Sequence, residues 1–281
     1  MLGSTMFNYF VLKSNLEIWG TYRSGFPPNS LVTNDRSNLI PLNLSDNEGE
    51  IHALVNRINP VAIINCVGLI KQRTEIEDVL KAVPINTLLS HQLQIVAKNV
   101  GAKLIHFSTD CVFSGAVGNY SEEDTPDAKD IYGLTKYLGE VTGENSLTLR
   151  TSIIGHEIRT KLSLLEWFLS QEKEIEGYTG VFFSGLPTNE VARVVLDILE
   201  EHSNLSGMYH LSAERISKYD LLSIINTKYK KNLEIHRSEK LKIDRSLNSE
   251  KLGNRIGYKP RSWDRLIEEM KEFKDECDRY F

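Results

Sequence analysis

The sequence predicts an α/β protein in which helices cover both faces of a doubly wound parallel sheet, with a smaller C-terminal region. Between residues 16 and 154, short segments rich in β-branched residues alternate with amphipathic segments. The lengths between these segments suit crossover connections between parallel strands. The chain of 281 residues exceeds the usual size of a single core, and its 41% hydrophobic and 25% charged residues match an ordinary globular protein.

The first half of the chain contains the segments expected to build the sheet. A helix is expected at 3–13, where Met6, Phe7, Phe10 and Val11 share one apolar face. The expected strands are 16–22, 39–44, 61–66, 103–107 and 147–154. Two further helices are expected at 86–99 and 132–144. In such a fold, ligands bind beyond the carboxyl ends of the strands.

The second half is less regular. Its expected helices are 162–171, 189–202, 217–228 and 263–277, and its expected strands are 180–183 and 208–211. Phe182 and Phe183 are assigned to the core, after a loop that could face a sugar ring or base. No Pro/Gly-rich linker separates the halves, so the smaller region is expected to pack on the sheet.

Composition excludes several classes of function. A formal net charge of -5 without a basic stripe argues against nucleic-acid binding. Cys66, Cys111 and Cys277 lack the close spacing of metal ligands, so no metal site is expected and the thiols are interpreted as free. No apolar run approaches the roughly 20 residues that span a bilayer. These features predict a cytoplasmic protein with no membrane partner.

The strongest chemical signal is the segment Tyr132-Gly-Leu-Thr-Lys136. Tyr132 and Lys136 lie one helical turn apart, so an ammonium can sit beside a phenol. A neighbouring cation favours the phenolate and brings the phenol pKa closer to neutrality. Thr109, at the end of a strand, could donate a hydrogen bond to a carbonyl that is being reduced.

The Tyr-x-x-x-Lys pair alone is a weak signal, because such spacing more often marks an exposed packing pair. Its context strengthens it, since a strand ending in Ser108-Thr109-Asp110 comes 23 residues before the tyrosine (132 − 109). Further segments in a matching order are Ile64-Asn65-Cys66-Val67-Gly68, Ile85-Asn86, Phe107 to Gly115, Tyr120-Ser121-Glu122-Glu123-Asp124, Gly139-Glu140 and Leu149-Arg150-Thr151-Ser152.

Taken together, these segments resemble the extended short-chain dehydrogenase/reductases, closest to the branch with dTDP-4-dehydrorhamnose reductase and related nucleotide-sugar 4-ketoreductases. The resemblance covers most of the chain. It implies a Rossmann-like dinucleotide-binding domain at 1–154, to which 186–205 returns, and a mainly substrate-binding domain at 155–281.

The resemblance also implies site residues. Tyr132 would be the general acid, Lys136 would hold the nicotinamide ribose, and Thr109 would polarise the ketone. The residues expected around the cofactor are Gly3, Arg23, Asn43, Leu44, Cys66, Val67, Gly68, Asn86, Ser108, Tyr132, Lys136, Thr151 and Ser152. Those expected around the substrate are Thr109, Asp110, Val112, Phe113 and Arg245; a guanidinium at position 245 suits the oxygens of a diphosphate.

The choice between NAD and NADP as cofactor is predicted from Arg23. It occupies the position where a dinucleotide fold chooses between NAD and NADP, and an arginine there accommodates a 2′-phosphate. We therefore expect NADP(H), against the alternative of an exposed loop arginine. At the position where the family binds the adenine of the cofactor, Asn43-Leu44 replaces the common Asp-Leu. The Asn side-chain amide still offers a carbonyl oxygen as a hydrogen-bond acceptor.

These observations predict NADPH-dependent reduction of a 4-keto nucleotide-diphosphate sugar, in deoxysugar or surface-polysaccharide synthesis. A homodimer is compatible with the sequence. One alternative is a UDP-N-acetyl-hexose reductase or epimerase-like enzyme. Another is a non-catalytic homologue that binds a nucleotide or a protein partner, as a regulatory subunit of methionine adenosyltransferase does.

The beginning of the chain motivates the non-catalytic alternative. No strand or glycine-rich turn precedes the helix expected at 3–13, although a doubly wound sheet usually starts with both. A further reading places Met1 inside a natural glycine loop, with Leu2-Gly3 as its tail and roughly a dozen residues upstream.

Overall fold

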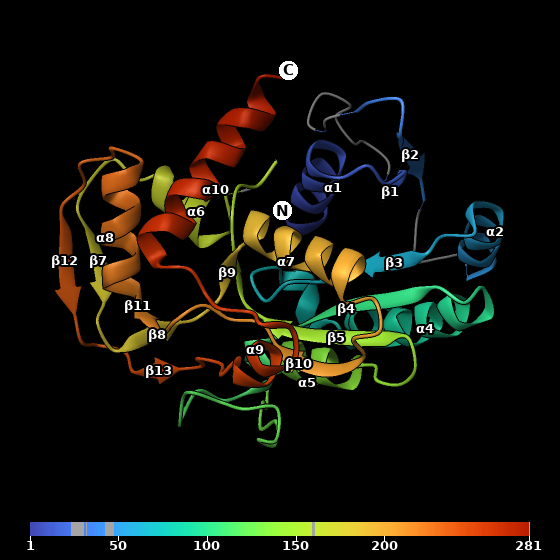
Figure 1. The fold of residues 1–281 in the computed structure, drawn as a ribbon. Coiled ribbons are helices and arrows are strands. Elements are labelled where there is room, and N and C mark those ends of the chain that lie inside the picture. The colour runs from blue at the N-terminus through green and yellow to red at the C-terminus, as the bar shows by residue number, and fades with distance from the viewer. Residues whose placement is uncertain (24–30, 32, 43–47, 159–160, 281) are drawn as a thin grey trace.

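The computed structural model of the chain describes residues 1–23, 31, 33–42, 48–158 and 161–280. The fold contains two parallel sheets, of which the larger lies at the centre of the molecule and the smaller lies beside α1 (Leu2–Lys13) (Figure 1). The larger sheet has the strand order β10-β5-β4-β3, and the smaller one pairs β1 with β2. The strands are β1 (Ile18–Tyr22), β2 (Ser37–Pro41), β3 (Ala62–Asn65), β4 (Lys103–Thr109), β5 (Ser146–Thr151) and β10 (Gly207–His210).

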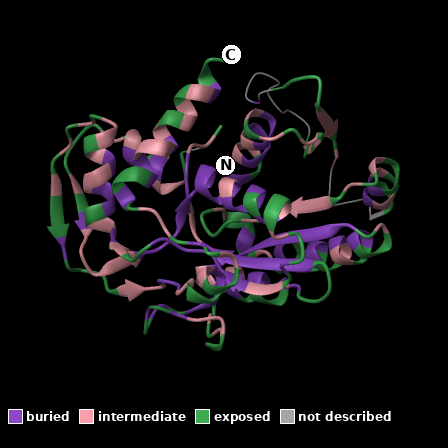
Figure 2. Cartoon of the chain, viewed as in Figure 1, coloured by how far each residue is buried: buried purple, intermediate pink, exposed green. Residues whose placement is uncertain are grey.

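Helices cover both faces of the larger sheet because β4 alternates its side chains. Ile105 and Phe107 pack in one cluster with Met6 of α1 (Leu2–Lys13) and with α7 (Thr188–Glu201). Leu104 points to the opposite face, where it packs with Leu89. The helices there are α2 (Glu48–Ile58), α4 (Leu89–Asn99) and α5 (Ile131–Leu138). Figure 2 shows β4 and β5 buried along their lengths.

Short elements connect these helices and strands. They are the 3-10 helices η2 (Thr74–Glu77) and η4 (Asp110–Val112), the helix α3 (Val79–Val83), and the π-helical turn η3 (Pro84–Leu88) that runs into α4. The strand pair β6 (Ile153–Ile154) and β9 (Leu186–Pro187) leads from the sheet toward the second half of the chain.

A smaller region packs against one end of the sheet (Figure 1). Its strands are β7 (Ile175–Tyr178), β8 (Val181–Phe183), β11 (Ile216–Ser217), β12 (Ile235–Ser238) and β13 (Ile243–Asp244). Its helices are α6 (Leu164–Leu169), α8 (Lys218–Lys228), α9 (Glu250–Ile256) and α10 (Trp263–Asp278). Trp263 and Leu266 join the same hydrophobic cluster as Ile105, so one core connects this region to the sheet.

The predicted α/β class is confirmed, with two informative differences in detail. The helix expected at 132–144 ends at Leu138. A Cβ atom on the next residue, Gly139, would lie 2.0 Å from the Asn86 carbonyl oxygen, and the chain turns away there. The segment that returns from the second half of the chain to the sheet is also longer than the expected 186–205, because β10 (Gly207–His210) pairs in parallel with β5.

Among the residues that the structure describes, none of the helices has the length and apolar character needed to cross a membrane.

Candidate functional site

A cavity of about 560 Å³ opens beyond the carboxyl ends of β3, β4 and β5. This is where ligands bind in open α/β sheets. Of the residues expected from the sequence, those that line the cavity are Gly3, Arg23, Cys66, Val67, Gly68, Ser108, Thr109, Asp110, Tyr132, Lys136, Thr151, Ser152 and Arg245. The chain therefore brings together residues that are more than 200 positions apart in sequence (245 − 3 = 242).

The cavity wall is strongly cationic, although the chain carries a net charge of -5. Its basic residues are Arg23, Lys71, Arg73, Lys136, Lys218 and Arg245, and its carboxylates are Asp110 and Glu157. Six cations against two carboxylates, gathered in a concave site, favour a ligand with several negative charges.

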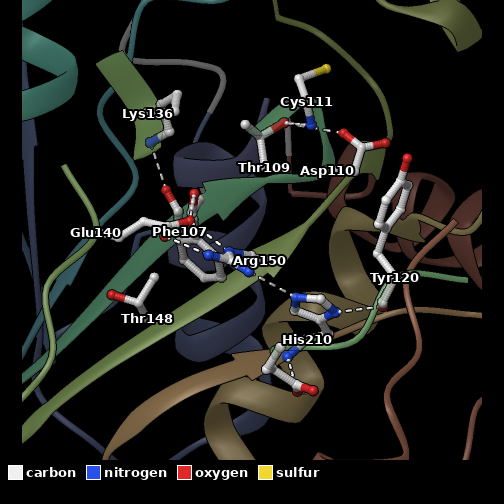
Figure 3. Close-up of polar contacts among 12 residues, drawn as sticks. Phe107, Thr109, Asp110, Cys111, Tyr120, Lys136, Glu140, Thr148, Arg150 and His210 are labelled. Carbon is white, nitrogen blue, oxygen red and sulfur yellow. Dashed lines mark hydrogen bonds and ion pairs between the residues drawn. The ribbon is translucent and has the colours of Figure 1, made fainter. Parts of the chain in front are cut away.

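Thr109 ends β4 and caps the short helix η4. Its hydroxyl oxygen accepts a hydrogen bond from the Cys111 amide at 3.1 Å, and its hydroxyl donates to the Asp110 carboxylate at 3.1 Å (Figure 3). Burial raises the pKa of Asp110, and the hydrogen bond from Thr109 acts in the opposite direction. The strand end thus holds a hydroxyl and a carboxyl side by side at the cavity wall.

Helix α5 positions Tyr132 against this strand end. The Asp130 carboxylate begins the helix by accepting a hydrogen bond from the Gly133 amide at 3.0 Å. A side chain at Gly133 is excluded, since its Cβ would lie 2.5 Å from the Cys111 carbonyl oxygen. This close approach brings the first turn of α5 against η4. Burial raises the pKa of Tyr132, so the phenol is protonated at neutral pH, while the Thr109 hydroxyl opposes the shift.

Lys136 points into the same site from one turn further along α5. Its ammonium donates a 2.6 Å hydrogen bond to the carbonyl oxygen of Phe107 on β4. Burial lowers the pKa of Lys136 to about 8, and Glu140 raises it in part. Helical spacing alone predicts an ammonium beside the phenol of Tyr132 and a lower phenol pKa. That expectation was wrong for this arrangement, because desolvation dominates and the ammonium binds the strand.

A buried polar network supports the strand end from behind. The Ser108 hydroxyl donates to the Glu140 carboxylate at 2.7 Å, and Arg150 forms an ion pair with the same carboxylate at 2.7 Å. Arg150 also contacts His210 of β10 at 3.3 Å, and His210 contacts the Tyr120 carbonyl oxygen at 3.0 Å (Figure 3). Burial, followed by the nearby Arg150, lowers the pKa of His210 to about 3.

Three expected residues lie behind the cavity wall. Asn86 is fully buried, and its side chain accepts from the Leu69 amide at 2.8 Å and donates to the Leu69 carbonyl at 3.2 Å. It therefore shapes the loop that follows Gly68. Val112 and Phe113 are also fully buried and do not reach the cavity. Phe113 instead stacks on Tyr120, and its carbonyl oxygen accepts from Arg245 Nε at 2.8 Å.

Asn43 and Leu44 lie outside the described residues. Conversely, the structure brings residues to the cavity that the sequence argument left out. They are Met1, Leu2, Asn65, Leu69, Ile70, Lys71, Gln72, Arg73, Phe107, Cys111, Ile153, Ile154, Glu157, Ser163, Leu164, Val181, Lys218 and Ile243. Phe182 and Phe183 combine the two roles weighed for them, because both line the cavity and Phe183 is also buried.

Comparison with protein families finds a match to the RmlD substrate binding domain over residues 12–273. Among curated proteins, spore coat polysaccharide biosynthesis protein SpsK of Bacillus subtilis is 26% identical over 256 residues, covering 84% of this chain and 88% of SpsK. The β subunit of methionine adenosyltransferase 2 from Xenopus laevis is 28% identical over 206 residues, covering 64% of this chain. The chain spans 58% of that subunit.

Two solved structures show the same fold. The dTDP-4-dehydrorhamnose reductase of Bacillus anthracis in complex with NADP has a TM-score of 0.73 at 20% identity, covering 91% of this chain and 98% of that one. The Bordetella bronchiseptica enzyme WbmG in complex with NAD and UDP has a TM-score of 0.78 at 17% identity, covering 98% of this chain and 91% of that one.

Proposed function

The chain belongs to the RmlD substrate binding domain family, and from this premise we propose that it reduces a 4-keto sugar linked to a nucleoside diphosphate, with NADPH as reductant. One observation carries the proposal: Thr109, Tyr132 and Lys136 line one cavity whose wall is cationic. A nicotinamide dinucleotide and a nucleotide sugar are both polyanions, so the charge of the cavity suits both.

The side chains at this strand end suit the chemistry of ketone reduction. NADPH supplies the hydride when bound. The buried Tyr132 phenol, protonated because its pKa is raised, donates the proton to the ketone oxygen. The Thr109 hydroxyl donates a hydrogen bond to that oxygen in place of Asp110, and Lys136 holds the ribose of the cofactor. The product is the corresponding alcohol.

Arg23 supports the choice of NADPH over NADH. It follows β1 directly and lines the cavity, which is where a guanidinium can contact a 2′-phosphate. The related folds do not decide the matter, since the Bacillus anthracis structure contains NADP and the WbmG structure contains NAD. We infer a role in deoxysugar or surface-polysaccharide synthesis, supported by the name of the relative SpsK.

The test is a screen of 4-keto sugars linked to dTDP and to UDP, in which consumption of NADPH is followed by absorbance. Tyr132→Phe removes the proton donor and keeps the ring, so kcat should fall roughly 10²- to 10⁴-fold while NADPH affinity is unchanged. Tyr137→Phe on the exposed side of the same helix is the matched control and should retain full activity. If Tyr132→Phe kept the kcat of the wild type, Tyr132 would not be the proton donor.

The same screen separates the alternatives. Turnover of UDP-N-acetyl-hexose derivatives alone identifies the reductase or epimerase-like enzyme, a choice motivated by UDP in the WbmG structure. A second candidate function, binding without turnover, is motivated by the similarity to a methionine adenosyltransferase β subunit. NADPH binding without oxidation by any sugar in the screen would favour that function.

A further inference from the structure

Lys218 is the first residue of α8, and the chain places it at the cavity by strand pairing. The preceding strand β11 pairs antiparallel with β8, so that Ser217 lies opposite Phe182. The Ser217 hydroxyl oxygen then accepts from the Asp220 amide at 3.0 Å and begins the helix. As a result Lys218 lines the cavity beside Phe183 of β8, and Arg245, just after β13, lines the same cavity.

The ammonium of Lys218 makes few stabilising interactions with the described residues of the protein. It lies 4.5 Å from the centroid of the Phe183 ring, a cation–π contact. Within the part of the chain that the structure describes, no carboxylate forms an ion pair with it. Burial lowers the pKa of Lys218 to about 8, and Asp110 and then Cys111 raise it in part. A half-buried cation at a cavity wall without a paired anion is costly to a fold and is typical of a ligand site.

The neighbouring cations are held differently. Arg215 is paired with the Asp244 carboxylate at 2.6 Å and stacks on Phe182, so its charge is balanced. Arg245 is anchored through Nε to the Phe113 carbonyl oxygen, which leaves the terminal amino groups of its guanidinium for other acceptors. Lys218 and Arg245 therefore offer unbalanced positive charge on the substrate side of the cavity.

We propose that Lys218 binds the phosphate adjacent to the sugar in a nucleoside-diphosphate sugar, an inference that rests on the proposed function. The position fixes which phosphate. Lys218 interacts electrostatically with Asp110 and Cys111, which directly follow Thr109, the residue assigned to the ketone. The anionic group closest to a ketone on the sugar ring is the phosphate bonded to that sugar. The N-terminal end of α8 adds partial positive charge on the same side.

The experiment measures calorimetric affinities of the full chain for UDP and dTDP, and for UMP and dTMP. Lys218→Met removes the charge and keeps a flexible apolar stem against Phe183. We expect it to weaken the binding of both diphosphates at least tenfold and of both monophosphates less than twofold. Lys218→Arg should retain diphosphate affinity within about threefold, because a guanidinium also binds phosphate oxygens. Lys240→Met, at an exposed lysine paired with Glu176, is the matched control and should change neither.

Each other outcome overturns a distinct statement. Unchanged diphosphate affinity in Lys218→Met, or equal weakening of diphosphates and monophosphates, overturns the role of Lys218 and leaves the reductase intact. A wild-type chain that binds NADPH but no diphosphate overturns this inference and the nucleotide-sugar substrate together. UDP-glucuronate and UDP-glucose are measured in the same way. If Lys218→Met weakened the binding of UDP-glucuronate but not that of UDP-glucose, Lys218 would bind a carboxylate on the sugar, which also overturns the inference. NADPH affinity should be equal in all variants.

Discussion

The Glu140 carboxylate and the Arg150 guanidinium form a two-point ion pair inside the molecule, with contacts of 2.7 Å and 2.8 Å. Both side chains are only 5% exposed. The Ser108 hydroxyl donates to the same carboxylate at 2.7 Å, so the pair fixes the residue directly before Thr109. A contact between a residue that follows α5 and a residue of β5 thereby sets the position of the strand end at the cavity.

The first prediction concerns the stability provided by this pair. Glu140→Gln keeps the shape and the hydrogen bond to Ser108 but leaves the Arg150 charge buried without an anion. Removing one partner of a buried pair costs about 3–5 kcal/mol. Urea denaturation should therefore show a loss of that size in the free energy of unfolding. The control is Glu276→Gln at the more exposed pair with Lys13, where the loss should be below about 1 kcal/mol. Equal losses in both variants would contradict the argument.

The second prediction concerns the choice of cofactor at Arg23. Arg23→Ala removes a guanidinium from the cavity wall, and charge-assisted hydrogen bonds contribute about 1.5–3 kcal/mol. NADPH affinity should fall roughly 10- to 100-fold in calorimetry. NADH affinity should change little, because NADH lacks the 2′-phosphate. Arg57→Ala, on α2 outside the cavity, is the control. If NADPH and NADH affinities fell equally, Arg23 would have no part in discriminating between them.

The sequence was sufficient to predict which strand ends meet, because the carboxyl ends of parallel strands share one edge of a sheet. Tyr132 and Lys136 could be paired in advance from helical spacing, and Thr109 could be added from the order of the segments. Lys218 could not, because its place at the cavity depends on the antiparallel pairing of β11 with β8, and nothing in its local sequence distinguishes it from a surface lysine. Long-range packing decides such positions.

Helix α5 shows the same limit on a smaller scale. Propensity and periodicity continue the helix to residue 144, but close contact with η3 stops it at Leu138. The hydrogen-bond partner of Lys136 could not be predicted from the sequence either. Spacing places its ammonium near Tyr132, whereas the fold presents the Phe107 carbonyl oxygen at 2.6 Å. A local sequence pattern contains no information about acceptors that other strands bring close to the same side chain.

The third prediction uses the contact that ends α5. Gly139→Ala would place a Cβ atom 2.0 Å from the Asn86 carbonyl oxygen, and overpacking costs typically about 1–3 kcal/mol. Thermal unfolding should show a lower midpoint, and kcat should also fall because α5 carries Tyr132. Gly49→Ala is the opposite case, since nothing lies within 4 Å of its added Cβ and it is on α2. That variant should gain up to about 1 kcal/mol from helix propensity. Stabilisation by Gly139→Ala would show that the contact with Asn86 can relax.

The fourth prediction is a loss of stability in mild acid that depends on His210. This imidazole is fully buried, and burial, followed by the nearby Arg150, lowers its pKa to about 3 in the folded protein from 6.5. The hydrogen bond to the Tyr120 carbonyl oxygen acts in the opposite direction. Below pH 6.5 the unfolded chain therefore binds a proton that the folded chain does not. Stability should fall as the pH decreases from about 6.5 toward 3, and each such histidine contributes a slope of up to about 1.4 kcal/mol per pH unit.

His106 has the same direction of shift, because burial and then Lys136 hold its pKa well below 6.5. Wild-type unfolding in urea, measured between pH 7.5 and 4.5, should thus show the combined slope of two buried imidazoles. His210→Asn cannot take up a proton on unfolding. Its free energy of unfolding should be lower than that of the wild type at pH 7.5, where the lost contact with Arg150 dominates, and should decline less steeply in acid. Parallel curves for the two proteins would mean that His210 is protonated in the fold, and that the contact with Arg150 is not made by a neutral ring.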